Sequence, residues 1–365
     1  MTPTLRSRRH LARGLSLIEV MIGLVIGMIA TLVVMQVFQL SEGARRTTVG
    51  GDDAQMAGTL TLTSLQREFR QAGYGSSAFP VLGCSLTMPG GWTLPAVAPV
   101  TINPPAAVVP AGDANTDTLL VMYGDSAGSP EGDLVSAQGP QTLYSVATPT
   151  SFAVGDFIIA AQEWTRPTGG GPRPAATPCA LTLERVTVVT SPSPPTVSVG
   201  VGTADMINGT LYNLGPNPRF IAYAVRGGNL TMCDYRANDC SQGVNDPTVW
   251  TPVGPGIVSI RAVYGRDATV PMDGAVDQYV RATPANQCDW ARVSALQMAV
   301  VARSGEFDRT LGTEVPVIAA PEWRASDAAP IDLTADADWQ RYRYKVFETT
   351  VPIKNMAWQG AQTGC

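Results

Sequence analysis

The sequence predicts an α+β protein in which one long N-terminal helix packs on a mainly antiparallel β-sheet domain with large loop insertions. Three patterns support this fold class: an apolar run near the N-terminus, an amphipathic continuation of that run, and short β-branched runs separated by proline-rich stretches. Of the 365 residues, 45% are apolar and 15% are charged, and the net charge is −5. Such a chain can bury a core, which excludes disorder throughout.

The apolar run extends from Leu15 to Met35 and is interrupted only by Ser16, Glu19 and Thr31 among small and apolar residues. At about 1.5 Å per residue it reaches roughly 30 Å, the thickness of the hydrocarbon core of a bilayer. It is preceded by four arginines and no acidic residue, namely Arg6, Arg8, Arg9 and Arg13. This charge bias predicts a single-pass protein with its N-terminus in the cytoplasm and the rest of the chain exported.

Beyond the membrane the helix is expected to continue. Met56, Leu60, Leu65 and Phe69 recur at spacings of three to five residues, which indicates an amphipathic helix to about Ala72. We expect Gly43 and the pair Gly50-Gly51 to loosen or bend it. The element is therefore expected to lie half in the membrane and half on an exported domain.

The exported domain is expected to begin after Gly73-Tyr74-Gly75, where apolar runs become short. Proline-rich connections separate these runs at Pro80 to Pro110, Pro167 to Pro178 and Pro192 to Pro195. A hairpin is predicted at Gly227-Gly228-Asn229. The predicted strands are Thr118 to Tyr123, Phe157 to Ala161, Leu181 to Thr190, Thr196 to Val201, Phe220 to Arg226, Leu230 to Cys233, Ile257 to Tyr264, Val293 to Ala302 and Arg343 to Val351. Periodicity alone also allows a helix at Val293 to Ala302, but the flanking turn residues favour a strand there.

Six cysteines all follow the apolar run, on the side of the membrane where disulfides persist. They are Cys84, Cys179, Cys233, Cys240, Cys288 and Cys365, and all six are disulfide candidates. Six cysteines allow fifteen pairings, and the sequence favours only one, a local bridge between Cys233 and Cys240. Cys365 would hold the C-terminus in place if it is paired. The spacing of Cys233 and Cys240 is not C-x-x-C, which argues against redox catalysis and a zinc ribbon.

Several classes of function are disfavoured by the composition. The single histidine, His10, precedes the apolar run, so imidazole nucleophile systems and histidine metal sites have no donor in the exported chain. Outside the first 13 residues there is no basic run, which argues against nucleic-acid binding. The paired carboxylates of Asp336 and Asp338 are expected to be solvated rather than catalytic. We therefore expect no cofactor, no metal and no enzymatic activity.

One acidic segment resembles the start of a calcium-binding loop. Asp113-Ala114-Asn115-Thr116-Asp117 carries its first three oxygen positions. The sixth position is Thr118 rather than glycine and the twelfth is Gly124 rather than glutamate. A turn that leads into the strand at Thr118 is the favoured interpretation.

A family resemblance lies at the start of the apolar run. Arg13-Gly14-Leu15-Ser16-Leu17-Ile18-Glu19 closely resembles the signal of type IV prepilins. The resemblance implies cleavage between Gly14 and Leu15 by a prepilin peptidase, methylation of the new Leu15 amine, and a glutamate as the fifth residue of the mature chain, here Glu19. It divides the chain into a leader (1–14), a transmembrane half-helix (15–37), an exported half-helix (38–73) and a β-rich periplasmic or extracellular domain (74–365).

Glu19 needs a physical explanation, because a carboxylate in a spanning helix costs several kcal/mol unless it is paired. Its partner is either the α-amine of a neighbouring subunit, which the resemblance favours, or water at the headgroups. Gly23, Gly27 and Thr31 recur every four residues. This stripe either lets another helix approach closely in subunit assembly or reflects the ordinary frequency of glycine in spanning helices.

Further stretches resemble the PilW-type minor pilins of the type IV pilus. They are Leu65 to Tyr74, Ile257 to Asp267, the segment ending at Val301-Ala302-Arg303-Ser304, and Tyr342 to Phe347 followed by Val351 to Asn355. This resemblance implies a pilin-like fold and a minor pilin that primes and joins pilus assembly, with roles in twitching motility, adhesion or DNA uptake.

The resemblance implies the prepilin peptidase, other minor pilins and the major pilin as partners, and it also allows a tip adhesin. The implied location is the inner membrane, with the C-terminal domain in the periplasm, and then the pilus fibre at the cell surface. Two alternatives remain open at this point. One is a pseudopilin of type II secretion. The other is a tip-located module in which Trp92, Trp164, Trp250 or tyrosines on the proline-rich loops contact carbohydrate or a surface.

Overall fold

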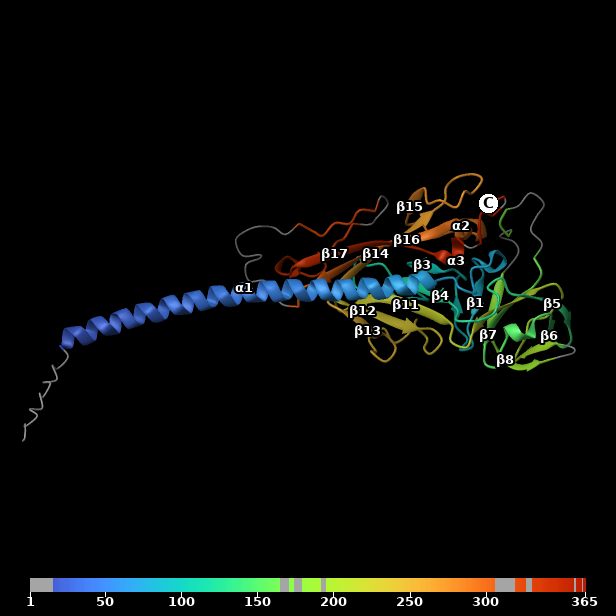
Figure 1. The fold of residues 1–365 in the computed structure, drawn as a ribbon, viewed down its shortest axis with the longest axis horizontal. Coiled ribbons are helices and arrows are strands. Elements are labelled where there is room, and N and C mark those ends of the chain that lie inside the picture. The colour runs from blue at the N-terminus through green and yellow to red at the C-terminus, as the bar shows by residue number, and fades with distance from the viewer. Residues whose placement is uncertain are drawn as a thin grey trace, which may run out of the picture. The chain divides into compact units, whose positions relative to one another are not determined.

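The computed structural model of the chain describes residues 16–164, 171–173, 179–191, 195–305, 319–325, 330–357, 359–362 and 364–365. Gly14 and Leu15, which flank the expected cleavage site, lie outside the described residues. Contacts within the chain divide it into two compact units, Met1–Gly50 and Gly51–Cys365. The second unit contains the end of the long helix and all of the strands (Figure 1).

The long helix is α1, Leu17–Gln71, which has 55 residues and belongs to both units. Its predicted end near Ala72 is confirmed. The helix passes through Gly43 and the Gly50-Gly51 pair without a gap in its helical assignment. In the first unit, the described residues after Ser16 are all part of this helix.

The second unit contains the remaining elements. They are the short helices η1 (Phe79–Val81), η2 (Pro149–Ser151), α2 (Gln287–Ala291), η3 (Trp339–Arg341) and α3 (Lys354–Ala357), and the strands β1 (Ser85–Thr87), β2 (Thr93–Leu94), β3 (Val100–Ile102), β4 (Leu119–Tyr123), β5 (Asp133–Gln138), β6 (Leu143–Val146), β7 (Phe157–Ala161), β8 (Ala180–Thr190), β9 (Thr196–Val199), β10 (Thr210–Gly215), β11 (Arg219–Arg226), β12 (Asn229–Asp234), β13 (Thr251–Pro255), β14 (Ile257–Arg266), β15 (Gln278–Val280), β16 (Val293–Arg303) and β17 (Tyr344–Pro352).

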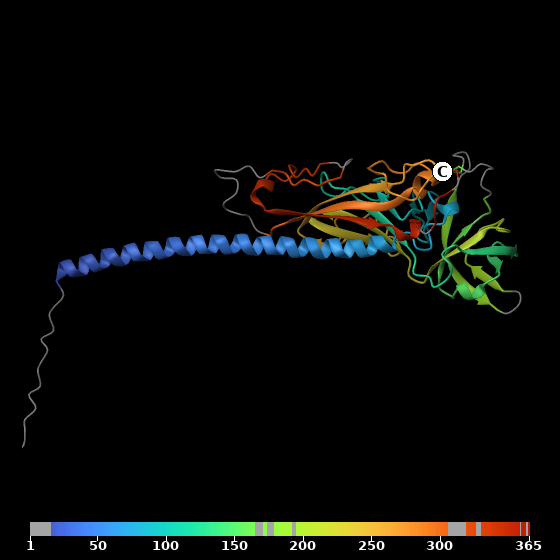
Figure 2. The same ribbon diagram turned by 45° about the horizontal axis from the view of Figure 1, so that its top comes forward.

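Two antiparallel sheets lie against the second part of α1. One has the strand order β13-β12-β11-β4-β3 and the other has the order β15-β14-β16-β17. Leu65 and Phe69 of α1, and Ala72 directly after it, share one buried core with residues of both sheets, such as Tyr223 of β11 and Met298 of β16. A second view shows β17 running beside α1 (Figure 2), where the side chains of Gln66 and Thr349 are hydrogen-bonded.

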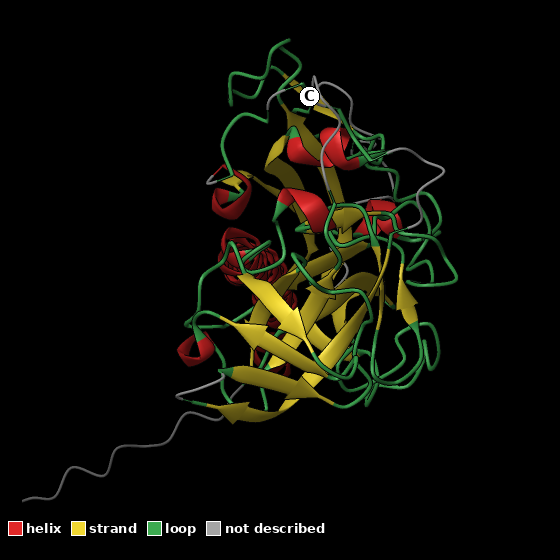
Figure 3. Cartoon of the chain, turned by 90° about the vertical axis from the view of Figure 1, so that its right-hand side faces the viewer, coloured by secondary structure: helices red, strands yellow, loops and turns green. Residues whose placement is uncertain are grey.

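The third sheet contains a small closed barrel. Strands β8, β7, β10, β5, β6 and β9 pair in that order, and β9 pairs again with β8. The barrel has its own core, which includes Tyr144, Ile158, Val186 and Leu211. It lies beyond the C-terminal end of α1 (Figure 1), and Figure 3 views the second unit from the barrel end. The whole barrel is inserted between β4 and β11, which are paired neighbours at Tyr123 and Arg219.

Strands β4 and β7 are apolar along their whole length because their side chains point alternately into two different cores. In β7, Ile158 faces the barrel core, whereas Ile159 faces a separate core that is shared with the five-stranded sheet. In β4, Leu120 faces that shared core and Val121 faces α1. Successive side chains of a strand point to opposite faces, so a strand buried on both faces needs a continuous apolar run.

The predicted fold class is confirmed: one long N-terminal helix lies on antiparallel sheet, with a large insertion. All nine predicted strands are present with bounds within two residues, including Val293–Arg303, and the Gly227-Gly228-Asn229 hairpin joins β11 to β12. The prediction that Pro80 to Pro110 is only a connection is wrong, because β1, β2 and β3 lie within it. These strands have two or three residues each, too few to show a period in the sequence.

Candidate functional site

The first part of α1 presents an apolar surface that no described residue of the chain covers. One stretch is long and apolar enough to span a membrane, Leu17–Gln39, and none of it is buried. A surface of this size in water would drive association or membrane insertion.

Glu19 lies in the first turn of α1 and is exposed. Its Oε2 atom accepts a hydrogen bond from the backbone N–H of Ser16 at 3.3 Å. One such bond leaves a carboxylate with free acceptor positions. Glu19 therefore retains the capacity to bind a cation at the start of the helix.

The small residues at Gly23 and Gly27 pack against no other part of the chain that the structure describes. A Cβ atom added at Gly23 or Gly27 would meet no heavy atom within 4 Å. Thr31 turns its hydroxyl back to its own helix, donating to the carbonyl oxygen of Gly27 at 2.6 Å. The stripe leaves room beside the helix that another chain could occupy.

The second part of α1 is fixed to the sheets by both apolar and polar contacts. Phe69 is fully buried and packs edge-on against Tyr223, with ring centroids 6.4 Å apart. The hydroxyl of Tyr123 donates to Glu68 Oε2 at 2.6 Å. Burial and this carboxylate raise the pKa of the Tyr123 hydroxyl, so it remains a donor at neutral pH. Glu68 was not singled out in the sequence, because nothing in the helical pattern indicates a buried tyrosine opposite it.

A groove of about 520 Å³ runs along the exposed side of this same part of α1. Two of its lining side chains, Met56 and Leu60, are 67% and 64% exposed. Opposite them lie Val253 of β13, which is 43% exposed, and Gly256. Its lining residues on the helix share a three-and-four spacing and are Asp53, Met56, Ala57, Leu60, Thr61 and Ser64. An exposed apolar stripe with this spacing is typical of a surface that contacts another helix.

The acidic segment at 113–117 does not form a calcium loop. Asp113 accepts hydrogen bonds from the backbone N–H groups of Gly227 and Gly228, at 2.9 and 2.8 Å. Asp117 is 1% exposed and forms ion pairs with Arg261 and Arg281. The two carboxylates therefore serve separate structural purposes, and the favoured interpretation as a turn before β4 agrees with the structure.

A second pocket, of about 340 Å³, lies beside that turn. Its acidic residues are Asp113, Asp332 and Asp336, and Arg303 pairs with Asp336 at 2.9 Å. Asp332 accepts from the backbone N–H and the hydroxyl of Thr334, which lowers its pKa. The polar groups of this pocket satisfy one another, so it does not indicate a ligand.

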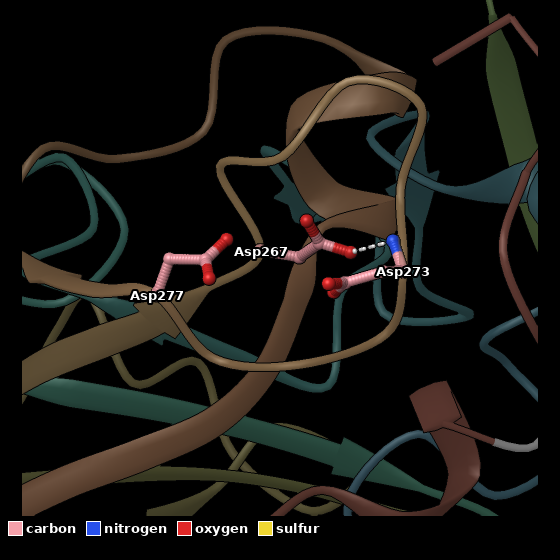
Figure 4. Close-up of side chains that lie close together, drawn as sticks. All are labelled: Asp267, Asp273 and Asp277. Atoms are coloured by element: carbon pink, nitrogen blue, oxygen red, sulfur yellow. Dashed lines mark hydrogen bonds between the residues drawn. The ribbon is translucent and has the colours of Figure 1, made fainter.

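Three further carboxylates that the sequence did not single out lie close together in one loop. Oxygen atoms of Asp267, Asp273 and Asp277 all lie within 4.8 Å of one another (Figure 4). Asp267 accepts from the backbone N–H of Asp273 at 2.8 Å, and Asp277 accepts from that of Ala268 at 2.7 Å. The N–H group of Ala268 lowers the pKa of Asp277. Loop-forming hydrogen bonds account for the cluster without a metal.

The three tryptophans considered for carbohydrate binding are engaged in packing. Trp92 donates its indole N–H to the carbonyl oxygen of Tyr235 at 3.0 Å. Trp164 packs against Phe79, with ring centroids 5.7 Å apart. Trp250 is 2% exposed, and the Arg226 guanidinium lies 4.3 Å from its ring centroid.

The six cysteines form three disulfides. Cys233–Cys240 is the local bridge that the sequence favoured, and it joins β12 to the segment that follows it. Cys84–Cys179 joins the start of β1 to the segment before β8. Cys288–Cys365 connects α2 to the C-terminal residue, whose carbonyl oxygen also accepts a hydrogen bond from Arg292.

One family model matches part of the second half of the chain. Residues 225–355 match the family model described as type IV pilus-assembly protein W. The comparison with curated protein sequences finds no match. Among solved structures, a type IV-like pilin from Thermus thermophilus is similar, with 13% sequence identity and a TM-score of 0.32, covering 84% of this chain and 96% of the Thermus chain.

The matched region begins at the end of β11 and reaches α3, so it contains the whole four-stranded sheet and excludes the barrel. It also contains the resembling stretches at 257–267 and 342–355. Residues 225–355 are thus similar to the type IV pilus-assembly protein W family, and the resemblance expected from the sequence is confirmed over that region.

Proposed function

We propose that this chain is a minor pilin: it enters the inner membrane, is cut between Gly14 and Leu15 by the prepilin peptidase, and then primes and joins assembly of a type IV pilus. The observation that carries this proposal is that one helix, α1, has an uncovered apolar part and a part buried against the sheets. Leu17–Gln39 is apolar and uncovered, whereas Leu65 and Phe69 of the same helix are buried in the exported unit. The uncovered part requires a bilayer or other apolar helices.

The two environments correspond to two stages. In the first, α1 holds the subunit in the inner membrane, with its N-terminus in the cytoplasm and the second unit in the periplasm. In the second, the apolar helix packs among helices of other minor pilins and the major pilin. Glu19, which is exposed at the start of α1, then pairs with the α-amine of a neighbouring subunit.

The groove beside α1 is the second contact surface of the proposed subunit. A helix of a neighbouring pilin would lie along α1 and cover Met56 and Leu60, whose spacing suits such a helix. Gly256 lies on the opposite wall, where a φ of +70° favours glycine. The role is structural and not enzymatic, which is consistent with carboxylates that are occupied by backbone N–H groups in the loop of Asp267.

The test is complementation of a strain that lacks the gene. We expect loss of surface pili in the deletion strain, and mass spectrometry of the restored protein should find a methylated Leu15 at its N-terminus. A bulky residue at Gly14 should leave an uncleaved precursor. Normal pili in the deletion strain, combined with a block in protein secretion, would instead assign the chain to type II secretion.

Two variants test the contact surfaces. Glu19→Ala should be cleaved normally but incorporated poorly into pili. Leu60→Arg should reduce incorporation, because it places a charge in the groove, whereas Thr63→Arg serves as a matched control on an exposed part of the same helix that does not line the groove. Equal incorporation of the Leu60→Arg and Thr63→Arg proteins would contradict the role of the groove.

A further inference from the structure

The two walls of the groove, α1 and β13, come together at Thr61 and Gly254. Thr61 is 6% exposed, and its Oγ1 atom would lie 2.9 Å from a Cβ atom added at Gly254. Gly254 is buried in a strand that is otherwise exposed, and its neighbours Val253 and Pro255 both line the groove. The same Cβ atom would lie 3.1 Å from atoms of two other side chains. Glycine at this position therefore lets α1 lie directly against the strand.

A second glycine faces the other sheet, three residues earlier in the helix. The ring of Phe347 in β17 occupies the place where a Cβ atom of Gly58 would be, and Gly58 is buried. Strands β13 and β17 belong to different sheets, so α1 contacts both of them through a glycine within one turn. Glycine is unfavourable inside a helix, and close packing accounts for it at Gly58.

The C-terminal end of α1 is fixed independently of these two glycines. Phe69 is fully buried in the core. The side-chain amide of Asn355 donates to the carbonyl oxygens of Gln71 and Ala72, both at 3.0 Å. Carbon atoms in contact lie about 3.5–4.0 Å apart, so a methyl group at Gly58 requires a shift of about 1–2 Å. The earlier turns of α1 would make this shift by tilting about the fixed end.

The direction of the shift follows from the two contacts together. A methyl group at Gly58 pushes α1 away from Phe347, but Thr61 already touches Gly254 on the side of β13. A methyl group at Gly254 pushes α1 the other way, where the Phe347 ring blocks it. In both cases the helix has to rise away from the sheets.

We propose that Gly58 and Gly254 are positioning residues that set the width of the groove. They hold α1 close to both sheets, so that Met56 and Leu60 lie across one groove from Val253. A single partner helix can then contact both walls, as packing between helices requires close approach. The identity of the occupant, a helix of a neighbouring pilin, rests on the proposed function, whereas the width of the groove does not.

The test is a distance measurement by electron paramagnetic resonance on the full chain in lipid nanodiscs. Spin labels are placed on Gln55→Cys of α1 and Thr251→Cys of β13, which are both exposed. The described cysteines are all paired in disulfides, so only the two new ones take the label. Gly58→Ala should lengthen the mean distance by about 2 Å, because Gln55 lies farther from the fixed end than Gly58 does.

Gly51→Ala is the matched control for this change. It makes the same substitution in the same helix, but its Cβ atom would meet no heavy atom within 4 Å, so the distance should not change. Phe347→Leu, which has a smaller side chain, should return the distance to its starting value when it is combined with Gly58→Ala. Gly254→Ala should lengthen the distance from the other side, and it serves as the test if Gly58→Ala does not fold. An unchanged distance in the folded alanine variants of these two glycines would overturn the proposal.

Incorporation into pili tests what the width of the groove is for. Gly58→Ala should be incorporated about tenfold less than Gly51→Ala, the effect of losing one well-packed contact, and Phe347→Leu should restore it. Normal incorporation of a Gly58→Ala protein with a lengthened distance would overturn the link between groove width and partner. Absence of the unsubstituted chain from pili would contradict the proposed function instead, and the distances would still decide whether the glycines set the width.

Discussion

Asp117 is expected to be the most sensitive single polar residue of the exported unit. It is 1% exposed, and its carboxylate pairs with Arg281 and with Arg261, which is itself 4% exposed. It also accepts the backbone N–H of Ala262 at 3.0 Å and the side-chain amide of Asn103 at 2.9 Å. The carboxylate therefore joins β14 of one sheet to the turn before β4 of the other.

Asp117→Ala would leave the guanidinium of Arg261 buried without its counter-charge. Breaking a buried ion pair by removing one partner costs about 3–5 kcal/mol, and the unpaired N–H group of Ala262 adds about 1–3 kcal/mol. Allowing for local water entry, we expect a loss of about 4 kcal/mol in the free energy of unfolding. The assay is guanidinium denaturation of the full chain in detergent with its disulfides intact, followed by tryptophan fluorescence.

Two further variants make the test specific. Asp338→Ala removes a carboxylate whose side chain is 48% exposed in its pair with Arg341, and it should cost less than about 0.5 kcal/mol. Asp117→Ala combined with Arg261→Met should recover part of the loss, because the orphaned cation is removed as well. A loss below about 1 kcal/mol for Asp117→Ala, or no recovery in the double variant, would refute the assignment of Asp117 as a buried counter-ion.

Three other predictions concern the same unit. Burial raises the pKa of Asp133, an effect that a hydrogen bond from Ser151 partly offsets, so the folded state binds a proton more readily than the unfolded state. Stability should therefore rise as the pH falls through the folded-state pKa, and denaturation curves of Asp133→Asn between pH 7 and pH 4 should lack this gain. Removing Cys84–Cys179, which spans 95 residues, should cost about 4–5 kcal/mol, against about 2 kcal/mol for Cys233–Cys240, which spans 7, as measured from the midpoints of paired Cys→Ala variants. Phe69→Ala should lower the free energy of unfolding of the second unit by about 3–5 kcal/mol and leave the membrane half of α1 helical by circular dichroism. Loss of the membrane-half helix together with unfolding of the second unit would contradict the separation of the two units.

The elements that the sequence predicts well are those whose pattern is local. The extent of α1 follows from a continuous apolar run and an amphipathic repeat, and strands such as β7 and β11 are apolar on both faces. Of the short strands, β2 pairs with its neighbour β1, whereas β1 also pairs with the distant strand β8 and β3 pairs with β4. Leu86, for example, pairs with Leu94 on one side and with Leu181 on the other. No window of sequence contains that information.

Candidate sites, too, could be predicted only where they depend on one continuous segment of the sequence. The uncovered helix and Glu19 could be identified from the sequence, because membrane insertion depends on composition over one continuous segment. The groove could not, because its second wall at Val253 and Gly256 is about 200 residues away from Met56 in the chain. Asp117 was judged by its neighbours in sequence as a calcium ligand or a turn residue, whereas its partners Arg261 and Arg281 come from β14 and from the segment after β15.

The closed barrel illustrates why an insertion can be large and still belong to the core. The chain runs into the barrel from the end of β4 and returns from it to the start of β11. These two strand ends are paired neighbours, so the insertion does not interrupt the sheet. Yet Ile159 and Tyr212 on its outer face, together with Leu120 and Phe220 of the sheet, form one buried cluster. The five-stranded sheet is thus covered by α1 on one face and by the barrel on the other. The region matched by the pilus-assembly family begins after the barrel, but its strand β12 pairs with β11, one of the two strands that the barrel covers. The barrel is therefore not a separable appendage, and deleting it would expose apolar side chains of the five-stranded sheet such as Leu120 and Phe220.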